Sequence, residues 1–148
     1  MSIASLCRGA LLGVLCLPAV ALASEGHDLV FQGDASFQGP HGGQAIAVAL
    51  VEAESGEVLA RQEGRVAGEG ETAFAFEFPG ALMPETAYEV HYWIDSNFGG
   101  GGEGVCDAMS QDHQWRVALD PAMGDLTHTE THDPARLGEV CDSFMMEG

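Results

Sequence analysis

The stretch Thr72–Phe78 reads TAFAFEF, and it is the strongest structural signal in the sequence. Phenylalanine occupies every second position, at 74, 76 and 78, with alanine or glutamate between. Successive side chains of a β-strand point to opposite faces, so this alternation places the three aromatic rings on one face. A strand with one aromatic face and one small or charged face is half buried, and the stretch therefore predicts an all-β core.

Alternation with period two continues on both sides of this stretch, and no long segment shows the 3.6-residue period of a helix. Glycine, proline and serine separate the alternating segments, as turns between short strands require. The sequence thus predicts one small β-sandwich of seven or eight mainly antiparallel strands. The further strand regions are Asp28–Gln38, Gln44–Ala53, Val58–Glu63, Ala87–Asp95, His113–Leu119, Leu126–His132 and Gly138–Phe144.

The N-terminal segment Met1–Ala23 has the three parts of a secretory signal peptide. Arg8 supplies the positive charge, a short apolar run follows, and Ala21-Leu22-Ala23 offers small residues at a cleavage site. The alternative is a membrane anchor, but the fifteen residues of Gly9–Ala23 fall short of the about 20 needed to span a bilayer. We expect cleavage after Ala23, a mature β-sandwich domain of residues 24–148, and a periplasmic or secreted location.

Cleavage would remove Cys7 and Cys16 and leave Cys106 and Cys141. In an oxidising compartment two remaining cysteines are most simply a disulfide, and a bridge between positions 35 apart stabilises a fold by about 3–4 kcal/mol. A thiolate metal site is the alternative, and it needs reduced sulfurs. The disulfide would tie the C-terminal strand region to the glycine-rich loop that begins near position 98.

The strand pattern, together with Cys106, Trp115 and Cys141, resembles small extracellular β-sandwich modules of the immunoglobulin-like or transthyretin-like kind. This resemblance covers the mature chain and implies two packed sheets. In immunoglobulin domains the paired cysteines lie on strands of opposite sheets, whereas Cys106 falls in a loop here. The likeness is therefore architectural, and it implies no ligand or activity.

The composition is strongly acidic. The chain has 23 acidic residues and no lysine, and the mature part keeps four arginines, which leaves it a net charge of −19. Such a charge repels phosphate backbones and anionic lipid surfaces, so nucleic acids and membrane surfaces are disfavoured as partners. The charge attracts cations, and it also suits simple solubility in a saline environment. The composition is compatible with a protein or polymer partner in the cell envelope.

The segment Asp95–Asp107 is the first candidate for a binding site. Oxygen-bearing side chains at alternate positions, followed by glycines, are what a hard cation needs to collect several ligands from one loop. The match to a calcium loop is partial, because Gly99 and Cys106 stand where side-chain oxygens are expected. A flexible, solvated strand connection is the alternative. The calcium ligands expected here are Asp95, Asn97, Glu103 and Asp107.

Histidines form the second candidate site. His128, Glu130 and His132 occupy every second position of a predicted strand, so they share a face. Neighbours two apart on a strand are separated by about 6.6 Å, and a ligand from another strand would complete a copper or zinc set. A polar edge strand that discourages edge-to-edge pairing is the alternative. The transition-metal set expected from the sequence is His91, His113, His128 and His132.

Signals for catalysis and for a partner surface are weaker. No serine stands in a nucleophile elbow, and no Lys-Ser/Thr pair follows the glycines to form a phosphate loop. Trp93, opposite the Tyr92 face of its strand, offers a binding patch for a partner or a seat for a covering loop. The sequence thus favours a non-enzymatic exported binding or accessory module. Transition-metal handling and a structural role in the envelope are the alternatives.

Overall fold

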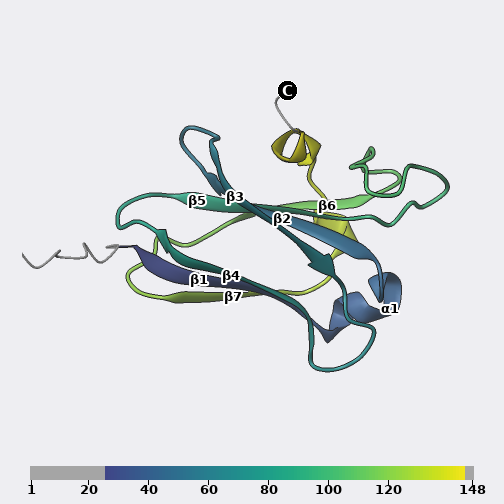
Figure 1. Ribbon diagram of the computed structural model, residues 1–148, viewed down its shortest axis with the longest axis horizontal. Helices are drawn as coiled ribbons and strands as arrows, with labels where there is room; N and C mark the ends of the chain where they lie inside the picture. Colours follow the sequence, from purple (N-terminus) through teal and green to yellow (C-terminus); the bar gives the residue numbers. More distant parts are fainter. Residues whose placement is uncertain (1–25, 146–148) are drawn as a thin grey trace, which may run out of the picture.

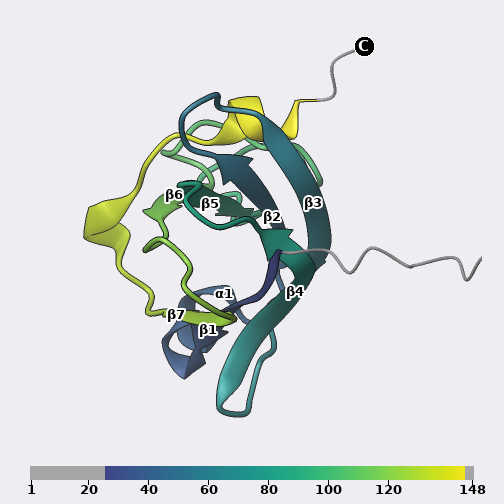
Figure 2. The same ribbon diagram turned by 90° about the vertical axis from the view of Figure 1, so that its left-hand side faces the viewer.

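The computed structural model describes residues 26–145, so the expected signal peptide, residues 1–23, lies outside the described residues. Strand makes up 44% of the structure and helix 12%. In the described part, seven strands form two sheets that stack as the layers of a sandwich (Figures 1 and 2). The predicted fold class, a small all-β sandwich with mainly antiparallel strands and one disulfide, is confirmed.

The first sheet has three strands in the order β4-β1-β7. Its central strand β1 (His27–Asp34) pairs antiparallel with β4 (Thr72–Leu82) and parallel with β7 (Leu126–Glu130). The phenylalanines of β4 at 74, 76 and 78 are at most 7% exposed, while Ala75 and Glu77 between them face solvent. The TAFAFEF alternation thus buries one aromatic face, as predicted.

The second sheet has four antiparallel strands in the order β3-β2-β5-β6. Its inner strands, β2 (Ala45–Glu52) and β5 (Tyr88–Ile94), are buried on both faces. The edge strand β3 (Val58–Arg65) alternates between half-buried and exposed residues, and β6 (His113–Ala118) forms the other edge. Burial of β2 and β5 on both faces requires a cover on the outer face of this sheet as well as the core beneath it.

Aromatic rings fill the space between the two sheets. Phe31 lies 6.1 Å from Phe74 and 5.3 Å from Tyr92 between ring centroids, and Tyr92 stacks on Trp115 at 4.8 Å. Burying apolar surface stabilises a fold by roughly 25 cal/mol per Å². These large rings, contributed by both sheets, therefore form the centre of the core.

Short helices lie between β1 and β2 and after β7. The strand region expected over Asp28–Gln38 is shorter in the structure and ends at Asp34. A 3-10 helix, η1 (Ala35–Phe37), follows it, and the Asp34 side chain caps this helix by accepting a hydrogen bond from the backbone N–H of Ser36. The helix α1 (Gln38–His41) follows directly and carries His41 into the interior. The predicted strand Gly138–Phe144 is instead a loop that ends in a 3-10 helix. The remaining 3-10 helices are η2 (Pro134–Arg136) and η3 (Cys141–Phe144).

The C-terminal segment covers the outer face of the second sheet. Val140 and Phe144 pack on Trp93 of β5, and the Phe144 ring lies 6.3 Å from the indole. The Cys106–Cys141 disulfide joins this segment to the long β5–β6 loop, as predicted. The covalent link therefore holds the cover in place.

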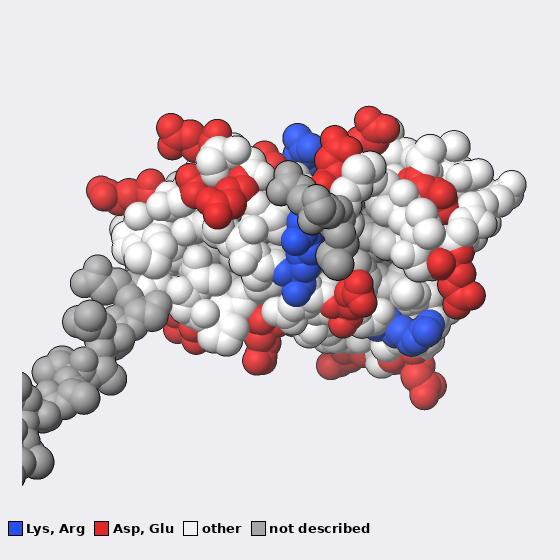
Figure 3. All heavy atoms as spheres, turned by 45° about the horizontal axis from the view of Figure 1, so that its top comes forward, with Lys and Arg blue, Asp and Glu red and all other residues white. Residues whose placement is uncertain are grey.

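The surface keeps the acidic character of the sequence. Acidic side chains are spread over the face shown in Figure 3, and the few arginines are scattered among them. Within residues 26–145 no helix is long and apolar enough to cross a membrane. The disulfide is compatible with an extracellular or periplasmic protein.

Candidate metal centre

Three histidines from separate elements meet at the end of the sandwich where α1 and the β5–β6 loop lie (Figure 1). His41 ends α1, His113 begins β6, and His132 follows β7. Nε2 of His41 lies 3.0 Å from Nδ1 of His113 and 3.2 Å from Nε2 of His132. Within residues 26–145 this is the only group of three or more His, Cys, Asp or Glu whose ligand atoms all lie within 4.8 Å of one another.

Hydrogen bonds beside the β1–β7 pairing fix the position of His132. Its backbone N–H donates to Oγ of Ser36 at 2.8 Å, and the hydroxyl of Thr131 donates to Oδ2 of Asp34 at 2.7 Å. The chain after β7 is thereby held against η1. Because α1 continues from η1 without a break, one capped turn positions both His41 and His132.

The register of the second sheet fixes His113, which pairs with Ile94 at the end of β5. Beside it, the buried carboxylate of Asp112 accepts hydrogen bonds from the backbone N–H groups of Ser96 and Asn97, each at 3.0 Å. These bonds join the two ends of the β5–β6 loop. The third ligand therefore comes from a rigid strand end.

Burial favours the neutral form of all three imidazoles by lowering their pKa values. Burial lowers the pKa of His41 to about 4, and the nearby histidines add to this effect while a hydrogen bond to Gln44 opposes it. Burial also lowers the pKa values of His113 and His132. Neutral imidazole is the form that binds a metal ion, so no proton has to be displaced from a positively charged ring.

The partner of Nδ1 determines the tautomer of His41. Oε1 of Gln44 lies 2.7 Å away, and because an amide oxygen only accepts, Nδ1 carries the proton and donates it. Nε2 then has a single lone pair, and it faces the ring nitrogens of both other histidines. Either His113 or His132 can donate a hydrogen bond to that lone pair, but a single lone pair does not serve both rings well. A metal ion bound between the three rings would instead accept a lone pair from each of the three nitrogens.

The two distances from Nε2 of His41 to the other ring nitrogens suit a tetrahedral metal site, and the nitrogens of His113 and His132 lie within 4.8 Å of each other. Nitrogens bound 2.0–2.1 Å from a zinc ion lie about 3.3 Å apart, close to the 3.0 and 3.2 Å observed. Trp115 packs edge-on against the three rings, and Phe98 lies 4.8 Å from His113 between ring centroids. His113 and His132 are partly exposed, so an ion can enter from the surface.

The structure brings together two of the four histidines expected from the sequence, His113 and His132, and adds His41. His128 instead stacks on Phe31 and lies 2.6 Å from Glu130. His91 faces the outer side of the second sheet and contacts Ser143. No local signal marks His41, because it lies between two alternating segments and the histidines it meets are more than 70 positions away in the chain.

The acidic side chains of the β5–β6 loop bind the loop's own amides. Oδ2 of Asp95 accepts from the N–H of Gly104 at 2.6 Å, and Oδ2 of Asp107 accepts from the N–H of Gly102 at 2.7 Å. Nδ2 of Asn97 donates to Oδ1 of Asp95 at 2.6 Å. Glu103 is exposed, and among the described residues Asp95, Glu103 and Asp107 form no cluster as close as that of the three histidines. These bonds give the loop its shape, and they occupy oxygens that calcium would need.

Trp93, expected as a binding patch, is 7% exposed beneath the C-terminal segment. Its indole edge lines a pocket of about 390 Å³ together with Glu63 and Arg65 of β3. The indole N–H has no hydrogen-bond partner among the described residues. The binding patch expected at Trp93 is thus largely covered by the C-terminal segment.

Comparison with protein-family models, curated proteins and solved structures gave no match to this chain. Evidence about function consequently comes from the geometry of the molecule itself.

Proposed function

We propose that this chain is an exported protein that binds a transition-metal ion, copper or zinc, through His41, His113 and His132. Its role at this site is to hold or deliver the ion. One observation carries the proposal: three histidine ring nitrogens from separate parts of the chain converge within 4.8 Å of one another at one end of the sandwich.

The donor set favours a borderline transition metal. Imidazole suits zinc and copper, whereas calcium and magnesium prefer oxygen ligands. Three protein ligands leave at least one coordination position for water or for a ligand on a partner. An ion held in this way can be exchanged, as metal transfer requires. The acidic surface raises the local concentration of cations around the site.

Export is part of the proposal and rests on the N-terminal segment Met1–Ala23 and on the cysteine pair. Disulfides persist in the periplasm and outside the cell, where thiols are not kept reduced. Metal binding by imidazole alone is also compatible with an oxidising compartment, since it needs no free thiolate.

The test is calorimetry and thermal unfolding of chelator-treated protein with zinc, copper(II) and calcium added in separate series. Zinc or copper should bind with a stoichiometry of one and raise the melting temperature. A free-metal concentration 100 times Kd adds about 2.7 kcal/mol to stability. Binding should be lost in His132→Ala and kept in His128→Ala, a matched control four positions away with its own partners.

Each possible result has a defined meaning. Copper(II) spectra showing imidazole nitrogens in the native protein but not in His113→Ala support the three-histidine site. Binding that survives both His113→Ala and His132→Ala contradicts it. A response to calcium alone, lost in Asp95→Ala, would assign the ion to the β5–β6 loop instead.

A further inference from the structure

A second constellation lies on the outer face of the four-stranded sheet, under the C-terminal 3-10 helix. Nδ1 of His91 lies 2.7 Å from Oγ of Ser143, and Nε2 of the same ring lies 2.8 Å from Oε2 of Glu89. Glu89 in turn forms an ion pair with Arg116 at 3.8 Å. A hydroxyl, an imidazole and a carboxylate are thus hydrogen-bonded in series.

The hydrogen bonds define which nitrogen acts as the base. The carboxylate of Glu89 accepts from Nε2–H, so the lone pair of His91 is on Nδ1 and faces the Ser143 hydroxyl. His91 is 4% exposed, and burial lowers its pKa while Glu89 opposes that shift. A neutral base therefore contacts a serine hydroxyl, and a third group orients the base.

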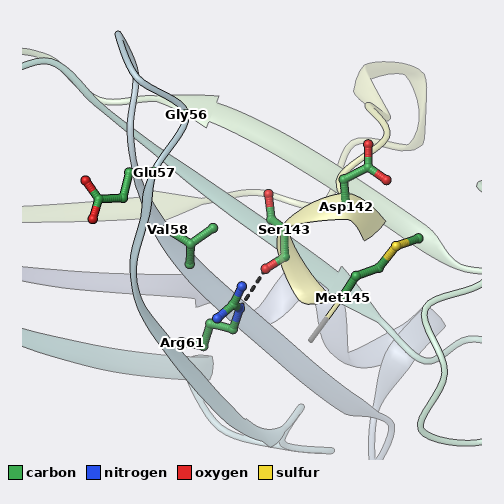
Figure 4. Close-up of a pocket in the computed structure, with 7 residues that line it drawn as sticks. All are labelled: Gly56, Glu57, Val58, Arg61, Asp142, Ser143 and Met145. Atoms are coloured by element: carbon green, nitrogen blue, oxygen red, sulfur yellow. Dashed lines mark hydrogen bonds between the residues drawn. The ribbon is translucent and has the colours of Figure 1, made fainter. Parts of the chain in front are cut away.

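Ser143 also lines a pocket of about 630 Å³ between the β2–β3 turn and the C-terminal segment (Figure 4). Val58 and Met145 give this pocket apolar walls, with Ser143 and Arg61 between them. Nε of Arg61 donates to the carbonyl oxygen of Ser143 at 2.7 Å, which fixes the serine backbone. Ser143 is thus placed beside a space large enough for a small substrate.

We propose that Ser143, His91 and Glu89 form a serine-esterase site for short, neutral acyl esters, separate from the metal centre. Val58 and Met145 would contact the acyl chain. Arg61, the one cation among the pocket residues, would attract the carbonyl oxygen as negative charge develops on it. Glu57 and Asp142 in the same pocket repel carboxylate-bearing substrates.

The reaction has two balanced halves. Oγ of Ser143 bonds to the ester carbon while its proton passes to Nδ1 of His91, and the ester C–O bond then breaks as the leaving alcohol takes that proton. Water next gives a proton to Nδ1 and its hydroxyl to the acyl carbon. The bond to Oγ breaks, Ser143 regains the proton from His91, and the carboxylic acid leaves.

The test uses a fluorophosphonate probe and 4-nitrophenyl acetate and butyrate on the wild-type protein in the presence of a chelator. A covalent adduct mapped to Ser143 is expected, with turnover that falls about 100-fold in Ser143→Ala and in His91→Ala. Glu89→Gln should lower kcat with little change in KM, as a positioning residue does. Ser110→Ala, an exposed serine of the β5–β6 loop, is the matched control and should retain full activity.

The proposal is overturned if wild-type protein forms no adduct and hydrolyses neither ester above the buffer rate. It is also overturned if Ser143→Ala retains the wild-type rate. If ester hydrolysis by the wild-type protein is seen only without chelator, and Ser143→Ala hydrolyses the esters equally well under that condition, the activity belongs to a bound metal ion and the proposal is overturned. Because the adduct is sought on wild-type protein, misfolding of a variant cannot decide the outcome.

Discussion

The imidazole of His41 shows how one side chain can be prepared for a metal by its neighbours. It is fully buried, and its only lone pair lies on Nε2 because Gln44 holds the proton on Nδ1. The hydroxyl of Ser96 lies 3.4 Å from the same Nδ1 and donates to the carbonyl of Ile94. Partners of this kind orient a ligand and increase its basicity.

Replacing Gln44 by leucine should therefore weaken metal binding without touching a ligand. Loss of the acceptor lets His41 carry its proton on either nitrogen, and such changes reduce metal affinity about 10- to 100-fold. Calorimetry with zinc measures the effect. Gln32→Leu, which removes a surface hydrogen bond to Thr129, is the control and should leave Kd unchanged. Equal affinities of Gln44→Leu and wild-type protein would show that the Gln44 contact plays no part.

The sequence pattern predicted two of the three histidines of the metal centre but not the third. His113 and His132 stood out because each lies on an alternating segment. His41 did not, because its place depends on the turn that follows β1 and on the parallel β1–β7 pairing, which are tertiary features. The Ser143–His91 contact joins residues 52 positions apart for the same reason.

At the scale of elements, alternation predicted strands well because burial on one face leaves a period of two in the sequence. It failed for Gly138–Phe144, whose apolar residues Val140 and Phe144 pack onto the outer face of a sheet rather than pair with a strand edge. Apolar residues of a covering segment and of a strand look alike in a short window. The disulfide pairing was predictable because only two of the four cysteines, Cys106 and Cys141, lie outside the expected signal peptide.

The β5–β6 loop depends on a glycine at 101. Its φ of 114° is one that side-chain-bearing residues rarely adopt, and a Cβ there would lie 2.5 Å from Oδ1 of Asn97 and Oδ2 of Asp107. Gly101→Ala should cost about 1–3 kcal/mol of unfolding free energy, measured by denaturant titration. The neighbouring Gly102→Ala has ordinary contacts and should lie within about 0.5 kcal/mol of wild type. Equal losses in both variants would contradict this account of the loop.

On the scale of the whole molecule, the two proposed sites use different surfaces of one sandwich. The histidine centre lies where α1, the first residue of β6 and the chain after β7 meet. The Ser143 site lies on the outer face of the four-stranded sheet. Both sites depend on the aromatic core that packs the two sheets against each other. The phenol of Tyr92 is fully buried in this core.

Tyr92 should make the fold sensitive to alkaline pH. Burial raises its pKa well above the usual 10, as do the charge of Glu130 and a 3.1 Å hydrogen bond to that carboxylate. A pKa raised in the folded state gives stability that is fully present below pH 10 and is lost as pH rises, because only the unfolded chain releases the proton. The free energy of unfolding, measured in denaturant from pH 8 to 11.5, should fall by up to about 1.4 kcal/mol per pH unit above 10 from this group. Tyr92→Phe, which starts less stable, should have a flatter profile there, whereas parallel profiles would show that other groups determine the alkaline limit.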